Sequence, residues 1–471
     1  MKIVLILAAA NNDPLKKTDP FMPLSLPLIA GSSPNHDYVF VDMLAGENPD
    51  YNIQADIVGI SARITAESKA YEIADNYRKK GITVVLGGAQ ISSVPHRAKE
   101  HADVVAVGEG EALWPIILEH YKSKELKDFY VCSPIAFDGK GKSVYQQNSY
   151  FDLKETPFAL RNIYRKRYDF DTVFASRGCP IQCDFCSVPT IFGKTIRKRP
   201  INDVLEDIKS FRNFYYLLDD TVFGRVADYD YYIELYNSIS LLPKKRYWTG
   251  QANLDAAAHP KGREVIKAAA KSGLLYAAIG IESINPEVLK NAGSINKVGA
   301  KTQDVLNEIK NNIRFIQEQG IVISGWFTVG YDEDSIDTFY QALEFCRETN
   351  IIPVISPIEA LPGTKLYDEM MIKSRIDHTK TINIIHPHMK ENEVVDAFRE
   401  VNKKGSSLKD IIKRTLFYSK IFDNSTKNIN EKIHNKIFKT IFTFVLQIKL
   451  RKGVVGFANT GSVSNLSKEK D

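Results

Sequence analysis

The stretch Ser176-Arg177-Gly178-Cys179-Pro180-Ile181-Gln182-Cys183-Asp184-Phe185-Cys186 carries three of the five cysteines of this 471-residue chain. Their spacing is CxxxCxxC, and three thiolates in one short loop can hold three irons of a [4Fe–4S] cubane while the fourth iron keeps an open position. The alternatives are ordinary buried cysteines or a zinc site completed by a distant histidine. Zinc ribbons use paired CxxC knuckles, and the sequence has no second knuckle. The spacing therefore predicts a cluster bound by Cys179, Cys183 and Cys186.

Composition indicates a multidomain protein of the reducing cytoplasm. A chain of this length with 44% hydrophobic residues spans about three average domains. Cys132 and Cys346 stand apart from the cysteine cluster, unlike a secreted disulfide framework. The start MKIVLILAAANN fits a signal peptide or a buried strand, and we expect the strand because an oxygen-labile cluster is unsuited to export. The formal charge of +5 forms no basic stripe, so we expect no nucleic-acid partner.

Residues 1–130 show a doubly wound α/β pattern. Apolar strand-like runs alternate with helix-like stretches such as Ala66–Lys80 and Glu111–Tyr121. The runs are Ile3–Ala10, Tyr38–Asp42, Ile57–Ser61, Val84–Leu86 and Val104–Val107. Glycines follow several of these runs, and such a sheet binds its ligand at the carboxyl ends of the strands. We therefore expect a Rossmann-like domain with ligand-facing loops there.

The rest of the chain divides into three parts. Residues 131–170 are a less regular linker, in which the polar tract DGKGKSVYQQNS indicates a surface hairpin or link. Strand and helix patterns resume over 171–370, where six β/α units predict a partial (β/α)6 barrel. Its expected strands are Thr172–Ala175, Tyr215–Leu218, Tyr247–Ala252, Tyr276–Ile281, Val322–Val329 and Val354–Ala360. Residues 371–471 predict a helical C-terminal region.

The cysteine motif, continued as SVPTIFGKTIRKRPINDVLEDIKS, resembles the cobalamin-binding-domain branch of the radical S-adenosylmethionine (radical SAM) superfamily. Enzymes of the hopanoid C-3 methylase and Mg-protoporphyrin ester cyclase type belong to it. The likeness extends from Met1 to about Asp368, since VGISARITAESKAYEIADNYRKKGITVVLGG and ADVVAVGEGEALW also resemble this branch. It implies a cobalamin-binding domain, a partial barrel, and SAM bound to the open iron and cleaved to methionine and a 5′-deoxyadenosyl radical. It also implies an external electron donor such as flavodoxin or ferredoxin.

The resemblance assigns SAM-binding roles to residues at barrel strand ends. Asp219 and Asp220 match the methionyl side, Glu282 the ribose-binding acid, and Leu361 the adenine-side loop. Gln251 is a candidate for SAM or the substrate; Trp326, Tyr331 and His386 are further substrate candidates. Each has an ordinary alternative: the aspartates can cap a helix, Glu282 can pair with a barrel lysine, and Leu361 begins a common turn sequence.

The N-terminal region lacks the DxHxxG motif that supplies a lower axial histidine to many cobalamin proteins. The radical SAM tryptophan methyltransferase family shows that cobalamin can bind without a protein ligand to cobalt; otherwise the domain is vestigial. Arg63 follows an expected strand and can stand beneath the corrin, or pair with Glu67 one helical turn on. The other candidates for contacts with cobalamin are Ser61, Thr65, Gly87, Gly88, Gly108 and Glu109.

The expected activity is cobalamin-dependent methylation of an unactivated carbon in a small molecule, lipid or peptide. A radical SAM cyclase, oxidase or carbon–carbon coupling enzyme uses the same cofactors, and a non-catalytic corrinoid or SAM sensor belongs to another class. The apolar run 437–448 has cationic flanks, so it can lie on a membrane surface or pack on the barrel. We expect a cytoplasmic protein, with peripheral membrane contact as an open alternative.

Overall fold

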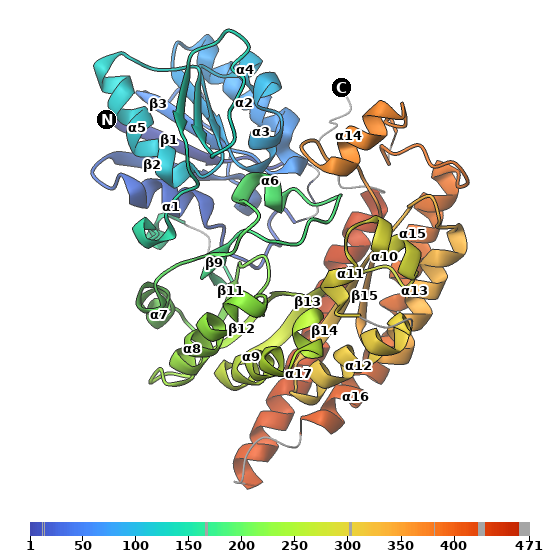
Figure 1. Ribbon diagram of the computed structural model, residues 1–471. Helices are drawn as coiled ribbons and strands as arrows, with labels where there is room; N and C mark the ends of the chain where they lie inside the picture. Colours follow the sequence, from blue (N-terminus) through green and yellow to red (C-terminus); the bar gives the residue numbers. More distant parts are fainter. Residues whose placement is uncertain are drawn as a thin grey trace. The chain divides into compact units, whose positions relative to one another are not determined.

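The computed structural model describes residues 1–11, 13, 15–164, 168–300, 304–380, 382–422 and 429–460 (Figure 1). The chain forms two compact units. The first contains Met1–Gly178 and Ser187–Asp203, and the second contains Cys179–Cys186 and 204–460.

A seven-stranded parallel sheet forms the centre of the first unit. Its strand order is β2-β1-β3-β4-β5-β6-β7. The strands are β1 (Lys2–Leu7), β2 (Asp37–Asp42), β3 (Ile57–Ser61), β4 (Thr83–Gly87), β5 (Val104–Val107), β6 (Phe129–Cys132) and β7 (Val144–Gln147). The order 2-1-3-4-5 is that of a doubly wound fold, and its topological switch point lies between β1 and β3.

Helices cover both faces of this sheet, which explains why its strands are apolar on both sides. In Figure 1, α2 (Glu67–Lys79), α3 (Ala89–Ser93) and α4 (Pro95–His101) lie on one side, while α1 (Ser25–Ser32) and α5 (Gly110–Ser123) lie on the other. The expected doubly wound α/β fold is therefore confirmed.

The sheet continues past residue 130, into the segment expected to be a linker. β6 and β7 pair in parallel, with Phe129 opposite Val144. The polar tract therefore contains β7, and the residues that lead from β6 to it form a crossover and not a hairpin. The hydrogen bonds from Ser143 N and Ser143 Oγ to Asp128 Oδ2, of 3.0 and 2.7 Å, fix its end beside the start of β6.

Five strands of the second unit pair in parallel, in the order β15-β14-β13-β12-β11, and belong to a six-stranded sheet that ends in β8 (Asp171–Val173). They are β11 (Phe214–Leu217), β12 (Tyr247–Ala252), β13 (Leu274–Glu282), β14 (Val322–Val329) and β15 (Ile352–Pro357). The helices between them are α8 (Tyr229–Ser240), α9 (Pro260–Ser272), α10 (Pro286–Asn291), α11 (Ile295–Val298), α12 (Val305–Glu318) and α13 (Ile336–Thr349). The order does not return to its first strand, as expected for a partial barrel.

Three helices end the described chain: α15 (Glu391–Gly405), α16 (Leu408–Ile421) and α17 (Ile429–Thr460). Tyr418 of α16 and Phe422 just after it form one apolar cluster with Tyr276 of β13 and Val322 of β14, and Phe442 packs against this cluster. The helices thereby cover the amino-terminal part of one sheet face. Within the described ranges, no helix is long and apolar enough to cross a membrane.

Candidate active site

The cysteine loop of the second unit combines burial with nearby charges. Cys183 is buried, and Cys179 and Cys186 are partly buried. Burial raises the pKa of Cys179 to about 11 and that of Cys183 to about 12. The Lys297 ammonium opposes this shift at both thiols, because a nearby cation favours the thiolate that a metal needs.

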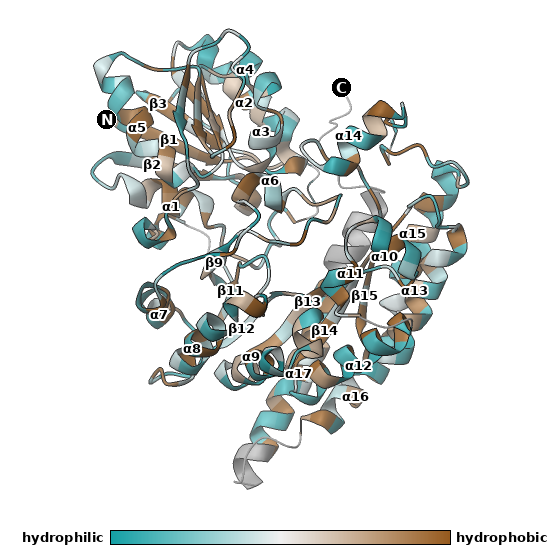
Figure 2. Ribbon diagram, in the orientation of Figure 1, coloured by the Kyte–Doolittle hydropathy of each residue, from teal (hydrophilic) through white to brown (hydrophobic). Residues whose placement is uncertain are grey.

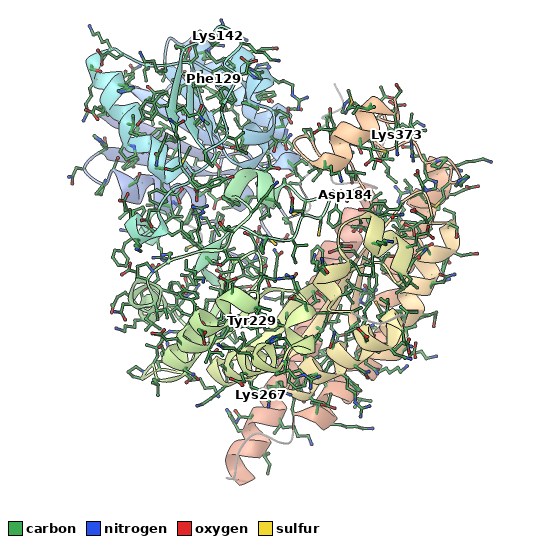
Figure 3. The ribbon with its side chains drawn as sticks, viewed as in Figure 1. Phe129, Lys142, Asp184, Tyr229, Lys267 and Lys373 are labelled. Atoms are coloured by element: carbon green, nitrogen blue, oxygen red, sulfur yellow. The ribbon has the colours of Figure 1, made fainter. Side chains whose placement is uncertain are left out.

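Asp184 fixes the centre of this loop through three segments of the second unit. Its N–H donates to Ala292 O at 3.2 Å, and its carbonyl accepts from Leu366 N at 2.8 Å. The Tyr331 hydroxyl donates to Asp184 Oδ1 at 2.8 Å. Burial raises the pKa of Asp184 to about 6, although the Tyr331 hydrogen bond acts in the opposite direction. Asp184 is labelled in Figure 3. We infer that it positions the loop, a role that the sequence analysis missed.

The two aspartates that follow β11 have different surroundings. Asp219 is fully buried and accepts a hydrogen bond of 3.0 Å from the Tyr232 hydroxyl of α8. Asp220 is partly buried, and its charge raises the pKa of Cys179, so it lies beside the cysteine loop. Of the two, Asp220 is therefore the one whose charge acts on the cysteine loop, while Asp219 bonds within the barrel.

Glu282 ends β13 in the left-handed region, with a φ of 68°, and is 5% exposed. It forms an ion pair with Lys297 of α11, and Thr328 Oγ1 lies 3.5 Å from its Oε2. The structure therefore contains the ion pair between Glu282 and a barrel lysine that the sequence left open. Burial lowers the pKa of Lys297, but the Glu282 carboxylate together with Cys183 and Cys186 outweighs burial and raises this pKa above its usual range. A Cβ at Gly280 would collide with both Glu282 Oε1 and Lys297 Nζ, so a larger residue there would have to displace the ion pair.

The remaining SAM candidates lie on separate segments. Gln251 is exposed near the end of β12, and its side chain bonds to Tyr216. Leu361 is partly buried after β15, and its carbonyl accepts from Thr364 Oγ1 at 2.7 Å. Its loop leads into Leu366, which binds Asp184, so this segment lies against the cysteine loop.

The second unit offers chemically suitable ligands for an iron–sulfur cluster and SAM. The three thiols lie in one loop and affect one another's pKa. Lys297 and two carboxylates, Asp220 and Glu282, act on the thiols of this loop. No three His, Cys, Asp or Glu side chains of the described chain are already gathered around a metal position.

In the first unit, Arg63 stands at the topological switch point. Its NH2 group lies 3.0 Å from Asp13 Oδ2, and its NH1 group lies 3.8 Å from Asp19 Oδ2. Thr65 Oγ1 donates to Asp13 at 3.2 Å. Asp13 follows β1 and Arg63 follows β3, so these side chains join the two strand ends where a doubly wound fold binds its ligand. The suggested pairing with Glu67 is wrong, because Glu67 pairs with Arg97 instead.

Glycine loops complete the carboxyl edge of this sheet. Gly87 ends β4, and Gly88 has a φ of 101°. A Cβ at Gly88 would lie 2.7 Å from Ala62 O and 3.1 Å from the hydroxyl oxygen of Ser61. The loop after β4 therefore passes directly against the loop after β3, and any side chain would push them apart. Gly108 follows β5 on the same edge.

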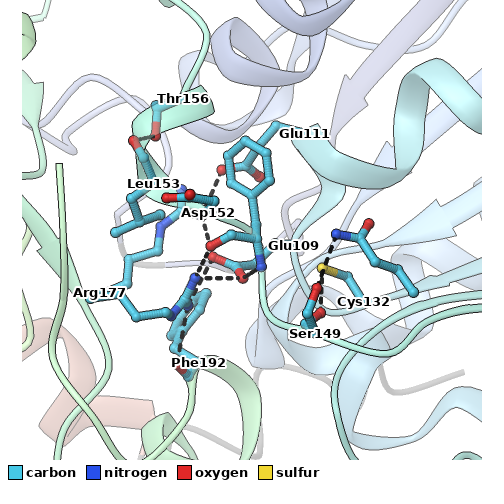
Figure 4. A network of polar contacts seen from close by, with 12 residues as sticks. Glu109, Glu111, Cys132, Ser149, Asp152, Leu153, Thr156, Arg177 and Phe192 are labelled. Carbon is cyan, nitrogen blue, oxygen red and sulfur yellow. Dashed lines mark hydrogen bonds and ion pairs between the residues drawn. The ribbon is translucent and has the colours of Figure 1, made fainter. Parts of the chain in front are cut away.

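Glu109 has a different role from the expected contact with cobalamin. It is 2% exposed; its Oε1 lies 2.8 Å from Arg177 NH1, and its Oε2 lies 3.0 Å from Arg197 NH1 (Figure 4). Phe151 N also donates to it, and Arg177 binds Glu111 at 2.6 Å. Both arginines belong to the short antiparallel pair β9 (Ser176–Arg177) and β10 (Arg197–Lys198). We therefore infer that Glu109 anchors the stem that precedes and follows the cysteine loop in sequence.

The histidines of the N-terminal region lie near the amino-terminal edge of the sheet. His36 directly precedes β2, and His101 lies three residues before β5, where it bonds to Asp75 at 2.9 Å. His96 packs on Phe129, the first residue of β6. His120 near the end of α5 bonds to Tyr130 at 2.8 Å. The ligand edge is the opposite one, so none of these histidines is placed there.

Comparisons with known proteins agree with this arrangement. The radical SAM superfamily model matches residues 173–346. The chain is 30% identical over 373 residues to bacteriochlorophyllide d C-12(1)-methyltransferase of Chlorobaculum tepidum, covering 76% of this chain and 75% of that protein.

Two solved structures share the fold. The radical SAM methyltransferase TsrM of Kitasatospora setae, solved with cobalamin and a [4Fe–4S] cluster, has a TM-score of 0.62 at 15% identity, covering 79% of this chain and 78% of that one. The cobalamin-dependent radical enzyme OxsB has a TM-score of 0.64 at 16% identity, covering 95% and 72%. With the cysteine loop, the partial barrel and the doubly wound domain, these findings show that the chain belongs to the cobalamin-binding-domain branch of the radical SAM superfamily.

Proposed function

We propose that this protein is a cobalamin-dependent radical SAM methyltransferase that acts on an unactivated carbon. Two observations carry the proposal. In the second unit, Asp220, Glu282 and Lys297 act on the thiols of the cysteine loop. The first unit is doubly wound, and Arg63 lies at its topological switch point. The relative from Chlorobaculum tepidum is named as a methyltransferase and supports this reaction. Cyclisation or coupling with the same cofactors remains the competing activity.

The chain's own residues bind and orient the proposed cofactors. When bound, the cluster and SAM supply a radical and cobalamin supplies a methyl group. Cys179, Cys183 and Cys186 would hold the cluster, while Glu282 would accept hydrogen bonds from the ribose of SAM. Asp220 and Leu361 lie on segments that can complete that site. Ser61, Thr65, Gly87, Gly88 and Gly108 would line the cobalamin beside Arg63.

Methyl transfer can be tested before the substrate is known. We expect anaerobically reconstituted protein, given SAM with a deuterated methyl group and a reductant such as flavodoxin, to carry the label to its cobalamin, measured by mass spectrometry. A product that gains the labelled methyl group identifies a methyltransferase. Turnover of SAM to 5′-deoxyadenosine without label on cobalamin or product would favour cyclisation or coupling.

The cobalt should lack a nitrogen ligand from the protein. A guanidinium group has no lone pair to donate, and none of the described histidines of the first unit lies at the ligand edge. Electron paramagnetic resonance of the cob(II)alamin form should therefore show no nitrogen splitting of the histidine type. Arg63→His should introduce that splitting, whereas Arg78→Ala, which removes a pair with Asp103 at a distance of 3.1 Å, should not change the spectrum. Nitrogen splitting in the wild type would overturn the ligand-free model, and failure to bind cobalamin would indicate a vestigial domain.

We further propose a cytoplasmic enzyme that docks on anionic membranes through α16 and α17. Exposed apolar residues repeat at helical spacing on both helices, at Leu408, Ile412 and Leu416 and at Ile433, Ile437, Ile441, Phe444 and Val445. Figure 2 shows apolar and polar segments alternating along α16. Exposed Lys409, Lys413, Lys420, Lys449 and Arg451 flank these residues. Over the described side chains of 408–451, the one acid is Asp410, which is buried and paired with Arg347 at 3.0 Å.

This charge pattern favours an anionic lipid surface. The protein should sediment with vesicles of phosphatidylglycerol and phosphatidylcholine, and less so at high salt. The double variant Ile412→Glu/Ile437→Glu should lose this binding. Leu241→Glu, at an 82% exposed position of the turn after α8, should retain it. Equal sedimentation of all three proteins would refute docking through these helices.

A further inference from the structure

Trp326 occupies an unusual position for a large aromatic residue. It lies within β14, yet it is 46% exposed, while its neighbours Gly325 and Phe327 are buried. The other two tryptophans of the chain, Trp114 and Trp248, are 4% and 0% exposed. A central strand that leaves an indole uncovered needs a specific explanation.

The alternation of the strand places Trp326 on the same face as Glu282. Phe327 packs on Phe345 of α13, on the helix-covered face. Residues two apart share a face, so Trp326 lies on the opposite face together with Ser324 and Thr328. Thr328 approaches Glu282. The indole therefore lies near the proposed SAM-binding carboxylate.

Hydrogen bonds hold the indole in one orientation. Trp326 Nε1 donates to Ser324 Oγ at 2.9 Å. Ser324 Oγ also lies 2.7 Å from the hydroxyl of Tyr276, which is buried against α16 and α17. The polar edge of the ring is thus satisfied within the protein, and the exposed part is its apolar surface. Such an oriented ring loses little entropy when a ligand stacks on it.

Two small residues of β13 are the cross-strand neighbours of Trp326 and Gln251. Gly280 stands opposite Trp326 across the β13–β14 pair, and Ala278 stands opposite Gln251 across β12–β13. Gln251 is exposed on its strand. Two strand spacings, about 10 Å, separate Gln251 from Trp326, and the ion pair of Glu282 and Lys297 lies over Gly280 on this face. Toward the amino-terminal ends of the strands, the same face is covered by α16 and α17.

We propose that Trp326 and Gln251 form the subsite for the methyl-accepting substrate, and that this substrate presents a flat, unsaturated ring with a polar edge. The indole stacks on the ring, and the amide binds the polar edge. The inference rests on the proposed function, because that function brings a second substrate to the face that carries Glu282.

The test uses protein labelled with 5-fluorotryptophan, whose three fluorine resonances are resolved by nuclear magnetic resonance. The resonance lost in Trp326→Phe assigns Trp326. 2-Naphthoate should shift this resonance and leave those of Trp114 and Trp248 in place. Trp326→Leu should weaken naphthoate binding about two- to tenfold, the usual range for one aromatic pair, while Trp326→Phe retains most of the affinity. Decahydro-2-naphthoate, which is saturated and cannot stack, should bind the wild type and Trp326→Leu equally.

Three results would overturn the proposal. An unmoved Trp326 resonance excludes the subsite, and equal loss of both probes in Trp326→Leu excludes ring stacking. If S-adenosylhomocysteine shifts the Trp326 resonance and loses affinity in Trp326→Leu, the indole stacks on the adenosyl group instead. Label transfer from SAM to cobalamin is measured separately, so its failure in the wild type, with naphthoate still bound, would reject the proposed function and not the ring-binding site.

Discussion

Replacing Cys179, Cys183 and Cys186 together with alanine is expected to abolish iron binding. A cubane needs thiolate ligands, and the loop offers no other sulfur. Iron content after anaerobic reconstitution should fall from about four per chain to near zero, and the broad absorbance near about 400 nm typical of such clusters should disappear. Because Asp184 fixes the loop through its own hydrogen bonds, the fold should survive and the melting temperature of the protein without iron should change little.

Cys132→Ala and Cys346→Ala are the matched controls. Both cysteines are buried among apolar residues, and burial raises the pKa of each thiol, that of Cys132 to about 12. Cys132 ends β6 and Cys346 lies in α13, so neither belongs to the cysteine loop, and both variants should keep a full complement of iron. A triple variant that retained about four irons would refute the assignment of the cluster, as would iron loss in both controls.

The strands were predictable where burial on both faces makes the sequence continuously apolar. β3, β12, β14 and the strands beside them lie at or within a few residues of their expected positions, because a buried parallel strand leaves a local signal. β7 gave no such signal: its residues Val144–Gln147 are all partly exposed, and it lies at the edge of its sheet. The crossover after β6 places β7 beside β6 in parallel, and the composition of β7 does not indicate this pairing.

Side-chain partners were harder to predict than strands. Arg63 has a suitable acid four residues away, yet it pairs with Asp13, which is 50 positions distant in sequence. The switch point brings β1 and β3 together, and this tertiary proximity prevails over an exposed helical pair worth only about 0.2–0.5 kcal/mol. Glu109 was likewise predicted to contact cobalamin because it lies in a glycine-rich loop. Its actual partners, Arg177 and Arg197, come from a later segment of the chain. A single sequence gives residue types and strand ends, and it does not show which charges will meet.

Glu282→Gln is expected to weaken SAM binding about 10- to 100-fold, the cost of losing charge-assisted hydrogen bonds worth roughly 1.5–3 kcal/mol. The same change should lower the melting temperature, because it leaves the buried Lys297 ammonium without its carboxylate, at a cost of about 3–5 kcal/mol. A single variant therefore mixes two effects. Affinity is best measured with S-adenosylhomocysteine, which is not cleaved.

The double variant Glu282→Gln/Lys297→Met separates ligand binding from barrel stability. Removing both charges leaves no unpaired ion, so the melting temperature should recover most of the loss seen in Glu282→Gln. If Glu282 binds the ribose of SAM, affinity for S-adenosylhomocysteine should remain weak in the double variant. Lys297→Met alone should keep Glu282 in place and lose less affinity than either variant without the carboxylate. A double variant that regained both stability and wild-type affinity would show that Glu282 serves Lys297 alone, and the ribose contact would then have to come from another strand end.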